Sequence, residues 1–415
     1  MNRQVRAEII AVGTELLLGD IVNTNAQFLS QELASLGISV YHQSVVGDNP
    51  ERLLQALSDA YDGRGVDLVI TSGGLGPTKD DLTKETGARF FGRSMEVHEE
   101  SLAHIKAIFG GLGVSMTESD HKPAILPQGA RAIFNNNGTA PGIFLQDGER
   151  TLIMLPGPPP EMLPMFKDGV VPLLSEITGR TYFSKTLRIC GIGESRVEDE
   201  LADIFEGQTN PTIATYAKTF ETHLRITADA HNKAAAQALI EPVAKEVYSR
   251  LKDGIYGEDD TTLEETLCKM LEERGMSLSL AESCTGGMVA SHIVNHPGAS
   301  KVLSECVVTY SDESKINRLG VSPSTLEQFG AVSEEVAREM AEGVAKTSNS
   351  SIGLSVTGVA GPEPADGKPA GLVYIAVCIS QNTFTTHINI KGSRQRVRTR
   401  ATVLALDFLR RCLLT

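Results

Sequence analysis

A serine followed by two glycines stands where an apolar strand pattern gives way to a helix pattern. SLSLAE is typical of a strand and GGMVASHIV of a helix, so Ser283 falls on the tight turn between them. Gly286 and Gly287 allow backbone N–H groups to approach a ligand there, and a helix start favours the negative charge of an oxyanion or phosphate. The alternative interpretation is that Ser283 is an N-cap.

A serine hydroxyl is a weak nucleophile until a base takes its proton, and the nearby motifs AESCTGG, TYSDESK and SVTGVAGP contain no histidine. Lys315 can serve as the base, because burial lowers the pKa of a lysine towards neutrality. Tyr310 can orient the serine or relay its proton, and Thr357 ends another apolar strand. The structural alternatives are a core aromatic for Tyr310, a solvated helix charge for Lys315 and a turn former for Thr357.

The segment KGSRQRVRTR adds an arginine cluster whose forked donors suit a phosphate, or which forms a solvated helix face. A second possible nucleophile, Cys284, lies beside Ser283, and thiolates are intrinsically stronger nucleophiles. No histidine is placed by motif to pair with this cysteine, so we favour Ser283.

The segment TSGGLGPTKDDLT, near the N-terminus, follows a continuous apolar run. Its glycines can expose backbone N–H groups to an oxygen-rich ligand, and its carboxylates suit a hard cation such as Mg²⁺. The alternative is a glycine turn before a capped helix. Three other loops carry polar residues in similar positions: VGTELLLGD, NNNGTAPG and LPGPPPEM. The candidate residues of all four loops are Thr14, Glu15, Gly73, Gly74, Gly76, Thr78, Asp80, Asp81, Asn137, Gly138, Gly157 and Glu161.

The elements that must position these residues alternate between strands and helices. VRAEIIAVG, VYHQSVVGD and VDLVITSGG are typical of strands, and residues 25–37 and 50–61 of helices. This rhythm implies a parallel sheet with helices on both faces and ligands beyond the carboxyl ends of its strands. The predicted fold class is α/β, with a three-layer α/β/α domain over 1–177, a small α+β unit over 178–257 and a second α/β domain over 258–415.

The middle segment contains GIGES, where a GxxG clamp for nucleic acid would be sought. Five acidic residues follow between positions 198 and 206 and would repel phosphates, so we favour a structural or dimerisation spacer. Tyr216 and Lys218 could reach a neighbouring active site.

The net charge of −14 argues against direct nucleic-acid binding and against an anionic membrane surface. The six cysteines form no CxxC pair and read as reduced thiols, which favours a cytoplasmic location. Charged residues interrupt the first apolar run too often for a signal peptide, and no stretch approaches the roughly 18 apolar residues of a membrane span.

The motifs around Ser283, with the arginine cluster, resemble the nicotinamide-nucleotide amidohydrolase domain of the CinA (competence/damage-inducible) family. The resemblance implies that Ser283 attacks the amide of nicotinamide mononucleotide, that ammonia leaves, and that water releases nicotinate mononucleotide without a cofactor. It makes Lys315 the base, Tyr310 a positioning group and Thr357 part of the same hydrogen-bonded network. It also implies that Arg394 and Arg398 bind the phosphate.

Residues 6–174 resemble the molybdopterin-binding-like domain at the front of full-length CinA proteins, and the middle segment resembles their KH-like domain. The resemblance implies metal-dependent hydrolysis of ADP-ribose to AMP and ribose 5-phosphate. Asp80 and Asp81 would hold Mg²⁺ or a similar divalent ion, and Glu15 or Glu161 would join them or act as base.

The expected protein is therefore a bifunctional pyridine-nucleotide salvage hydrolase that takes small nucleotides as substrates and forms a homodimer. The alternative is a pterin-binding or competence-related scaffold protein with a single active site or none.

Overall fold

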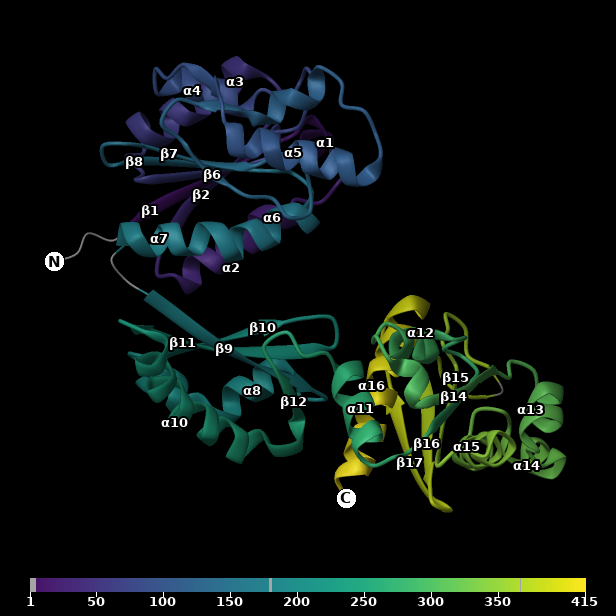
Figure 1. Cartoon of the computed structure of the whole chain (residues 1–415). Coiled ribbons are helices and arrows are strands. Elements are labelled where there is room, and N and C mark those ends of the chain that lie inside the picture. The colour runs from purple at the N-terminus through teal and green to yellow at the C-terminus, as the bar shows by residue number, and fades with distance from the viewer. Residues whose placement is uncertain (1–4, 179–180, 366) are drawn as a thin grey trace. The chain divides into compact units, whose positions relative to one another are not determined.

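The computed structural model describes residues 5–178, 181–365 and 367–415 (Figure 1). The chain divides into two compact units, one holding the chain up to Phe183 with Asp229–Ala236, and the other holding Ser184–Ala228 with Gln237–Thr415. The middle segment has a sheet of its own but belongs largely to the second unit.

The first unit contains a six-stranded sheet in the order β2-β1-β3-β8-β7-β6. The first four strands of this order are parallel. Strand β7 pairs antiparallel with β8, and β6 pairs antiparallel with β7. The strands are β1 (Arg6–Val12), β2 (Ser39–Val46), β3 (Leu68–Ser72), β6 (Arg131–Ile133), β7 (Gly142–Asp147) and β8 (Arg150–Leu155). A separate two-stranded antiparallel sheet pairs β4 (Met95–Val97) with β5 (Ile125–Pro127).

Helices cover both faces of this sheet, as the sequence alternation predicts (Figure 1). Alternate strand residues explain why: Ile9 packs with α2 and α6, whereas Ile10 packs with α3 on the opposite face. The helices are α1 (Thr14–Leu18), α2 (Thr24–Ser35), α3 (Pro50–Ser58), α4 (Thr83–Phe90), α5 (Glu99–Leu112), α6 (Pro159–Met165) and α7 (Val171–Thr178). Two of the predicted helices correspond to α2 and α3, and α3 begins with a proline at its first position.

The middle segment is an α+β unit with a four-stranded sheet in the order β10-β11-β9-β12. Its elements are β9 (Thr181–Cys190), α8 (Glu194–Glu200), α9 (Ala202–Gly207), β10 (Thr212–Ala217), β11 (Glu221–Ala230), α10 (Lys233–Leu251) and β12 (Ile255–Glu258). The last helix of the chain, α16 (Arg394–Leu414), contacts this segment through two arginines, and Asp407 of the same helix forms a buried ion pair with Arg410. Arg410 also donates to the carbonyl of Asp253, and Arg411 donates to that of Cys190.

The C-terminal part contains a five-stranded sheet in the order β14-β13-β15-β16-β17. Strands β14, β13 and β15 are parallel, and β16 and β17 are antiparallel. The strands are β13 (Leu278–Glu282), β14 (Leu303–Val308), β15 (Ile352–Gly358), β16 (Leu372–Ile379) and β17 (Asn382–Asn389). The other helices are α11 (Leu263–Glu273), α12 (Met288–Val294), α13 (Asp312–Leu319), α14 (Pro323–Phe329) and α15 (Glu334–Ser348).

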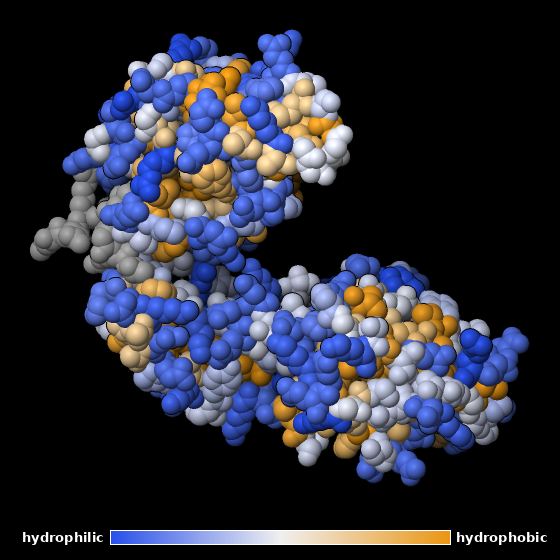
Figure 2. All heavy atoms as spheres, viewed as in Figure 1, coloured by the Kyte–Doolittle hydropathy of each residue, from blue (hydrophilic) through white to orange (hydrophobic). Residues whose placement is uncertain are grey.

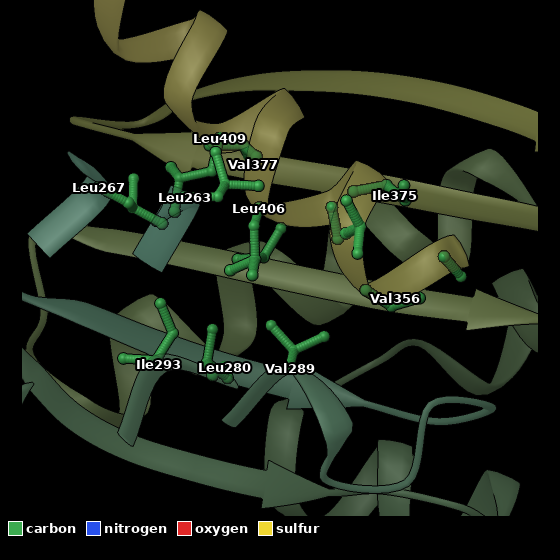
Figure 3. Close-up of a cluster of buried hydrophobic side chains, with 14 of the residues drawn as sticks. Leu263, Leu267, Leu280, Val289, Ile293, Val356, Ile375, Val377, Leu406 and Leu409 are labelled. Atoms are coloured by element: carbon green, nitrogen blue, oxygen red, sulfur yellow. The ribbon is translucent and has the colours of Figure 1, made fainter. Parts of the chain in front are cut away.

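Two hydrophobic layers enclose this second sheet. On one face, Leu280 and Val356 pack against α11, α12 and α16, and Figure 3 shows Leu406 directed towards this layer. On the other face, Ala281 packs with Leu319 of α13 and with α15. Successive residues of β13 therefore point to opposite layers, which determines the direction of every side chain at the end of that strand.

Hydrophilic side chains cover most of the face in Figure 2, with apolar patches scattered between them. In the described part of the chain, no helix combines the length and the apolar character needed to cross a membrane.

Candidate active sites

The carboxyl ends of three neighbouring strands each carry a buried hydroxyl residue. The β13–β14 and β13–β15 registers pair Glu282 with both Val308 and Val356, so Ser283, Thr309 and Thr357 follow side by side. The Ser283 amide donates to the carbonyl of Val356 at 2.9 Å, and the Thr309 amide donates to that of Glu282 at 2.9 Å. The ladder thus continues one residue beyond the strands.

Strand alternation places this row of hydroxyls on the face covered by α13 and α15. Ser283 has the parity of Ala281, which packs with α13 and α15, and Thr309 has that of Val307, which packs there too. Thr357 donates its hydroxyl to the carbonyl of Ala331 at 2.8 Å, so its side chain is already bonded away from Ser283.

The turn after Ser283 is held by the buried carboxylate of Glu282. This carboxylate accepts hydrogen bonds from the amides of Gly287, Val289 and Ala290 at 2.9 to 3.1 Å. The amides at the start of α12 are therefore occupied by the protein's own negative charge, contrary to our expectation that they meet a ligand. The N-cap of α12 is Gly287, so the alternative interpretation of Ser283 as an N-cap is wrong.

Both glycines of the turn have backbone angles that favour glycine. Gly286 has φ of +60° and Gly287 has φ of +91°, a region that costs other residues free energy. The sequence predicts that these glycines let the backbone approach a ligand. In the structure, their conformations serve mainly to form the turn itself.

The ammonium of Lys315 is enclosed on the same face as Ser283. Only 1% of the side chain is exposed, and its Nζ donates to the carbonyls of Thr309 at 3.2 Å and Tyr310 at 3.4 Å. The carboxylate of Asp312 lies 3.9 Å away. Burial lowers the pKa of Lys315, which counteracts the opposite effect of Asp312. The interpretation of this lysine as a solvated helix charge is therefore wrong.

The thiol of Cys284 points into the other layer. Cys284 is buried in the apolar cluster beneath α16, and burial raises its thiol pKa to about 12. Since the thiolate is the reactive form, this environment disfavours Cys284 as a nucleophile.

The side chain of Tyr310 alternates away from Thr309 and is 62% exposed. Its hydroxyl accepts a hydrogen bond from Arg394 at 3.1 Å, and Arg394 also donates to the carbonyl of Gly361 at 2.9 Å. Within residues 281–315, the structure places no hydrogen bond between the Ser283 hydroxyl and either Tyr310 or Lys315.

The second predicted phosphate binder, Arg398, holds the turn that follows Ser283. Its guanidinium donates to the carbonyls of Cys284 at 3.1 Å and Thr285 at 2.8 Å. Arg394 is exposed and Arg398 is half-buried, so the two arginines face different surroundings.

The glycine loop of the first unit follows β3 and is tightly packed against β1. A Cβ at Gly73 would lie 2.0 Å from the carbonyl oxygen of Val12, and Gly73 has φ of +113°. The hydroxyl of Thr83 donates to the carbonyl of Gly73 at 2.9 Å and closes the loop. Only glycine fits this position, and its amide donates to the carbonyl of Leu155 at 2.9 Å. The close approach of Gly73 is therefore to the neighbouring strands, and ligand binding by the loop stays a prediction.

The carboxylates of the loop are held by Thr78. Its amide donates to Asp81 at 2.9 Å, and its hydroxyl bonds to both Asp80 and Asp81. The hydrogen bond from Thr78 lowers the pKa of Asp80. Lys122 fastens the loop from behind, because its Nζ donates to the carbonyls of Thr78 at 2.6 Å and Asp81 at 2.5 Å.

This donor set fits one kind of metal binding. Among the described residues, no cluster of three or more His, Cys, Asp or Glu side chains could hold a metal ion alone. Two adjacent carboxylates, Asp80 and Asp81, instead match Mg²⁺ sites in which one or two protein ligands are completed by substrate phosphates and water.

Two cavities divide the other predicted residues of the first unit. One, of about 460 Å³, is lined by Glu15, Asn25, Ser72 and Gly157 among mainly apolar neighbours. The Asn25 amide donates to Ser72 at 2.8 Å and to the carbonyl of Gly157 at 2.6 Å, while its oxygen is buried without a hydrogen-bond partner. Thr14 lies outside this cavity and bonds to Asp48 at 2.8 Å.

The other cavity, of about 380 Å³, is lined by Asn135, Asn137 and Glu161, among others. Asn135 donates to the carboxylate of Glu161 at 2.6 Å, and a Cβ at Gly138 would lie 2.2 Å from that carboxylate. The two cavities share no lining residue, and the carboxylates of the glycine loop line neither. Glu15 and Glu161 thus belong to different cavities.

Sequence reasoning missed three residues of these sites: Glu282, Thr309 and Asn25. Thr309 carried a signal, because it follows an apolar strand pattern just as Ser283 does. The roles of Glu282 and Asn25 depend on partners that no local pattern identifies.

Three family models match successive parts of the chain. They are the "Probable molybdopterin binding domain" over residues 8–176, the damage-inducible protein CinA KH domain over 184–257 and the CinA C-terminal domain over 260–413. The solved structure of the protein CinA from Thermoplasma acidophilum is 36% identical, covers 42% of this chain and 98% of that chain, and has a TM-score of 0.38.

Full-length relatives are also similar. A protein of Alkaliphilus oremlandii is 52% identical over 408 residues, covering 98% of both chains. One of Clostridium perfringens is 53% identical over 409 residues, again covering 98% of both chains. Both are named as competence-damage inducible proteins. Since the identity extends over almost all of each chain, this protein belongs to the CinA family of competence-damage inducible proteins, with molybdopterin-binding-like, KH and C-terminal CinA domains.

Proposed function

We propose that the C-terminal domain hydrolyses the carboxamide of nicotinamide mononucleotide. One observation carries the proposal: Ser283 and the buried Lys315 occupy the same face of the sheet, at the carboxyl ends of its strands. Burial lowers the pKa of Lys315, so this lysine loses its proton more readily than a solvated lysine, which favours it as the base. Cys284 has the opposite character, since burial keeps its thiol protonated.

In this reaction the Ser283 Oγ attacks the amide carbon while its proton passes to neutral Lys315. The tetrahedral intermediate collapses when the C–N bond breaks, and the proton held by Lys315 goes to the departing nitrogen, giving ammonia. Water then adds to the resulting ester and gives its proton to Lys315. The C–O bond to Ser283 breaks, the serine regains a proton, and nicotinate mononucleotide leaves.

The arginines support a nucleotide substrate. Arg394 is exposed, carries a fixed positive charge, and is oriented by the hydroxyl of Tyr310 and the carbonyl of Gly361. Such a guanidinium suits a phosphate oxygen. Arg398 contributes differently, because it holds the carbonyls of the turn that presents Ser283.

The test is ammonia release from nicotinamide mononucleotide with a chelator present, using the full chain. Ser283→Ala should abolish release, and Cys284→Ala should largely retain it. The reverse pattern would overturn the nucleophile assignment. If the folded wild-type protein released no ammonia, the proposed amidohydrolase activity would be contradicted and a scaffold role would be favoured.

We also propose that the N-terminal domain hydrolyses ADP-ribose with a divalent ion. The glycine loop favours this function, because it lies at the carboxyl end of β3 and two adjacent carboxylates follow it. Asp80 and Asp81 would hold the ion, which when bound neutralises pyrophosphate charge and lowers the pKa of water. The apolar cavity beside Asn25, of about 460 Å³, has room for a planar heterocycle.

Asp81→Ala should abolish metal-dependent release of AMP and ribose 5-phosphate. The chain contains a matched control, since Thr117 donates its amide and hydroxyl to Asp120 at 2.7 Å in the same Thr-x-x-Asp arrangement. Asp120→Ala loses an equivalent loop cap and should keep full activity. If Asp81→Ala turned over ADP-ribose as fast as wild type, the site would be wrong, and binding of a pterin without turnover would support the alternative.

A further inference from the structure

Thr309 has a side chain with no structural task in the described part of the protein. The residue is 1% exposed, and its hydroxyl is buried without a hydrogen-bond partner. A buried hydroxyl that bonds to nothing destabilises the fold, and valine would fill the same space without that cost. The position therefore invites an explanation from function.

The main chain of Thr309 joins the two reacting groups of the proposed amidohydrolase. Its carbonyl accepts the hydrogen bond from Lys315 at 3.2 Å, and its amide donates to Glu282, the residue before the nucleophile, at 2.9 Å. Register and alternation place its side chain beside Ser283, on the face that holds Lys315. The unpaired hydroxyl thus lies on the face that holds nucleophile and base, next in register to Ser283.

The other nearby hydroxyl residues are less suited than Thr309 to connect Ser283 with Lys315. Tyr310, which we expected to orient the serine, is bonded to Arg394, and Thr357 is bonded to Ala331. Thr285 also has a buried, unpaired hydroxyl, but it lies in the turn after Ser283, and its carbonyl is held by Arg398. Lys315 donates to the carbonyls of both Thr309 and Tyr310, but only Thr309 of these two combines that contact with a buried, unpaired hydroxyl.

We propose that the hydroxyl of Thr309 relays the proton between Ser283 and Lys315, an inference that rests on the proposed amidohydrolase. As Ser283 attacks, its proton moves to the Thr309 oxygen, and the proton of Thr309 moves to neutral Lys315. Thr309 is unchanged, one proton has left the serine, and one has reached the amine. When ammonia departs, the same protons move in the opposite direction, so each step balances.

The same strand offers a matched control. Ser279 on β13 also has a fully buried hydroxyl without a partner, and it has the parity of Ser283. It lies four residues earlier, so at about 3.3 Å per residue it is more than 10 Å from the reacting atoms. A purely incidental unpaired hydroxyl should behave like Ser279.

The experiment measures kcat and KM for ammonia release from nicotinamide mononucleotide, with the melting temperature, for the full chain. Thr309→Val should lower kcat about 100-fold, the usual size of a proton-transfer contribution, with little change in KM. Its melting temperature should hold or rise, because an unpaired polar group is removed. Thr309→Ser should recover most of the rate, and Ser279→Ala should leave kcat unchanged.

The relay is overturned if Thr309→Val keeps wild-type kcat, or if it loses activity only together with folding while Thr309→Ser is equally impaired. Failure of the proposed function is a different result, namely a folded wild type that releases no ammonia. A fall in kcat that Thr309→Ser restores, in a variant as stable as wild type, supports the relay.

Discussion

The two candidate sites are built on similar foundations, since each has a buried lysine behind a loop that follows a parallel strand. Lys84 of α4 and Lys315 of α13 are each 1% exposed, and each donates its Nζ to a backbone carbonyl. Burial lowers the pKa of both, that of Lys84 to about 8. The difference lies in what stands beside each lysine.

Lys315 faces the row of buried hydroxyls, whereas Lys84 donates to the carbonyl of Lys122, which in turn fastens the glycine loop. The reactive candidates of the first unit, Asp80 and Asp81, are carboxylates near its surface. The C-terminal domain therefore holds the proposed nucleophile and the proposed base on one face of its sheet. The N-terminal domain holds a glycine loop and the proposed metal ligands, a set that would be completed by an ion and its substrate.

The largest expected effect comes from removing the ammonium of Lys315, and removal of the Lys84 ammonium serves as its comparison. Lys315→Met should lower kcat for ammonia release by about 1,000-fold, because a general base contributes roughly 10²- to 10⁴-fold. Lys84→Met should change ADP-ribose turnover by less than about tenfold, since Lys84 bonds to Lys122, and only Lys122 bonds to the glycine loop. Assaying both reactions on both variants provides the matched control. Equal losses in the two reactions would break the comparison.

The same comparison predicts how ammonia release depends on pH. Only the neutral amine of Lys315 accepts a proton, so kcat/KM should rise as pH rises through the lowered pKa of this lysine. The rise should be absent from the residual activity of Lys315→Met.

Lys84 should affect the free energy of unfolding more than the rate of either reaction. Its folded pKa of about 8 lies below its ordinary value of 10.5, so between these pH values the unfolded chain binds more protons. The free energy of unfolding should therefore rise with pH across this window, by about 3 kcal/mol for this group. Below pH 8 the amine is protonated in both states, and above 10.5 it is neutral in both.

The measurement compares denaturant unfolding of wild type and Lys84→Met at pH 7.5 to 10.5. Cysteines and tyrosines also titrate there, so only the difference between the two proteins isolates Lys84. A difference that does not change with pH would show that Lys84 is solvated in the folded protein.

Much of the fold was predictable because its signals are local. The apolar runs that end at Val12 and Ser72 predicted parallel strands, and the serine before two glycines predicted a strand-to-helix turn. Ser283 and Lys315 could be nominated by residue type and motif. Burial of Lys315 could not be deduced, because it depends on α13 lying against the sheet.

The remaining errors come from register and packing. Tyr310 was the more conspicuous residue, yet strand alternation directs it outwards to Arg394 and leaves Thr309 beside Ser283. The sequence predicts that Glu15 and Glu161 of the first unit share one site, but the order of strands separates them into two cavities. Pairings between distant strands are not encoded in any single motif.

The smallest expected effect separates the two arginines that one motif supplied. Arg394 is exposed and bonds to Tyr310, so Arg394→Met should raise KM for nicotinamide mononucleotide about tenfold, as expected for a charged hydrogen bond, with kcat preserved. Arg398 holds the turn carbonyls of Cys284 and Thr285, so Arg398→Met should mainly lower kcat. Nicotinamide riboside, which lacks the phosphate, is the control substrate, because Arg394→Met should leave its turnover unchanged. If both arginines altered only KM, and only for the nucleotide, then Arg398 would bind phosphate as the sequence motif predicts, and the turn would hold its shape without it.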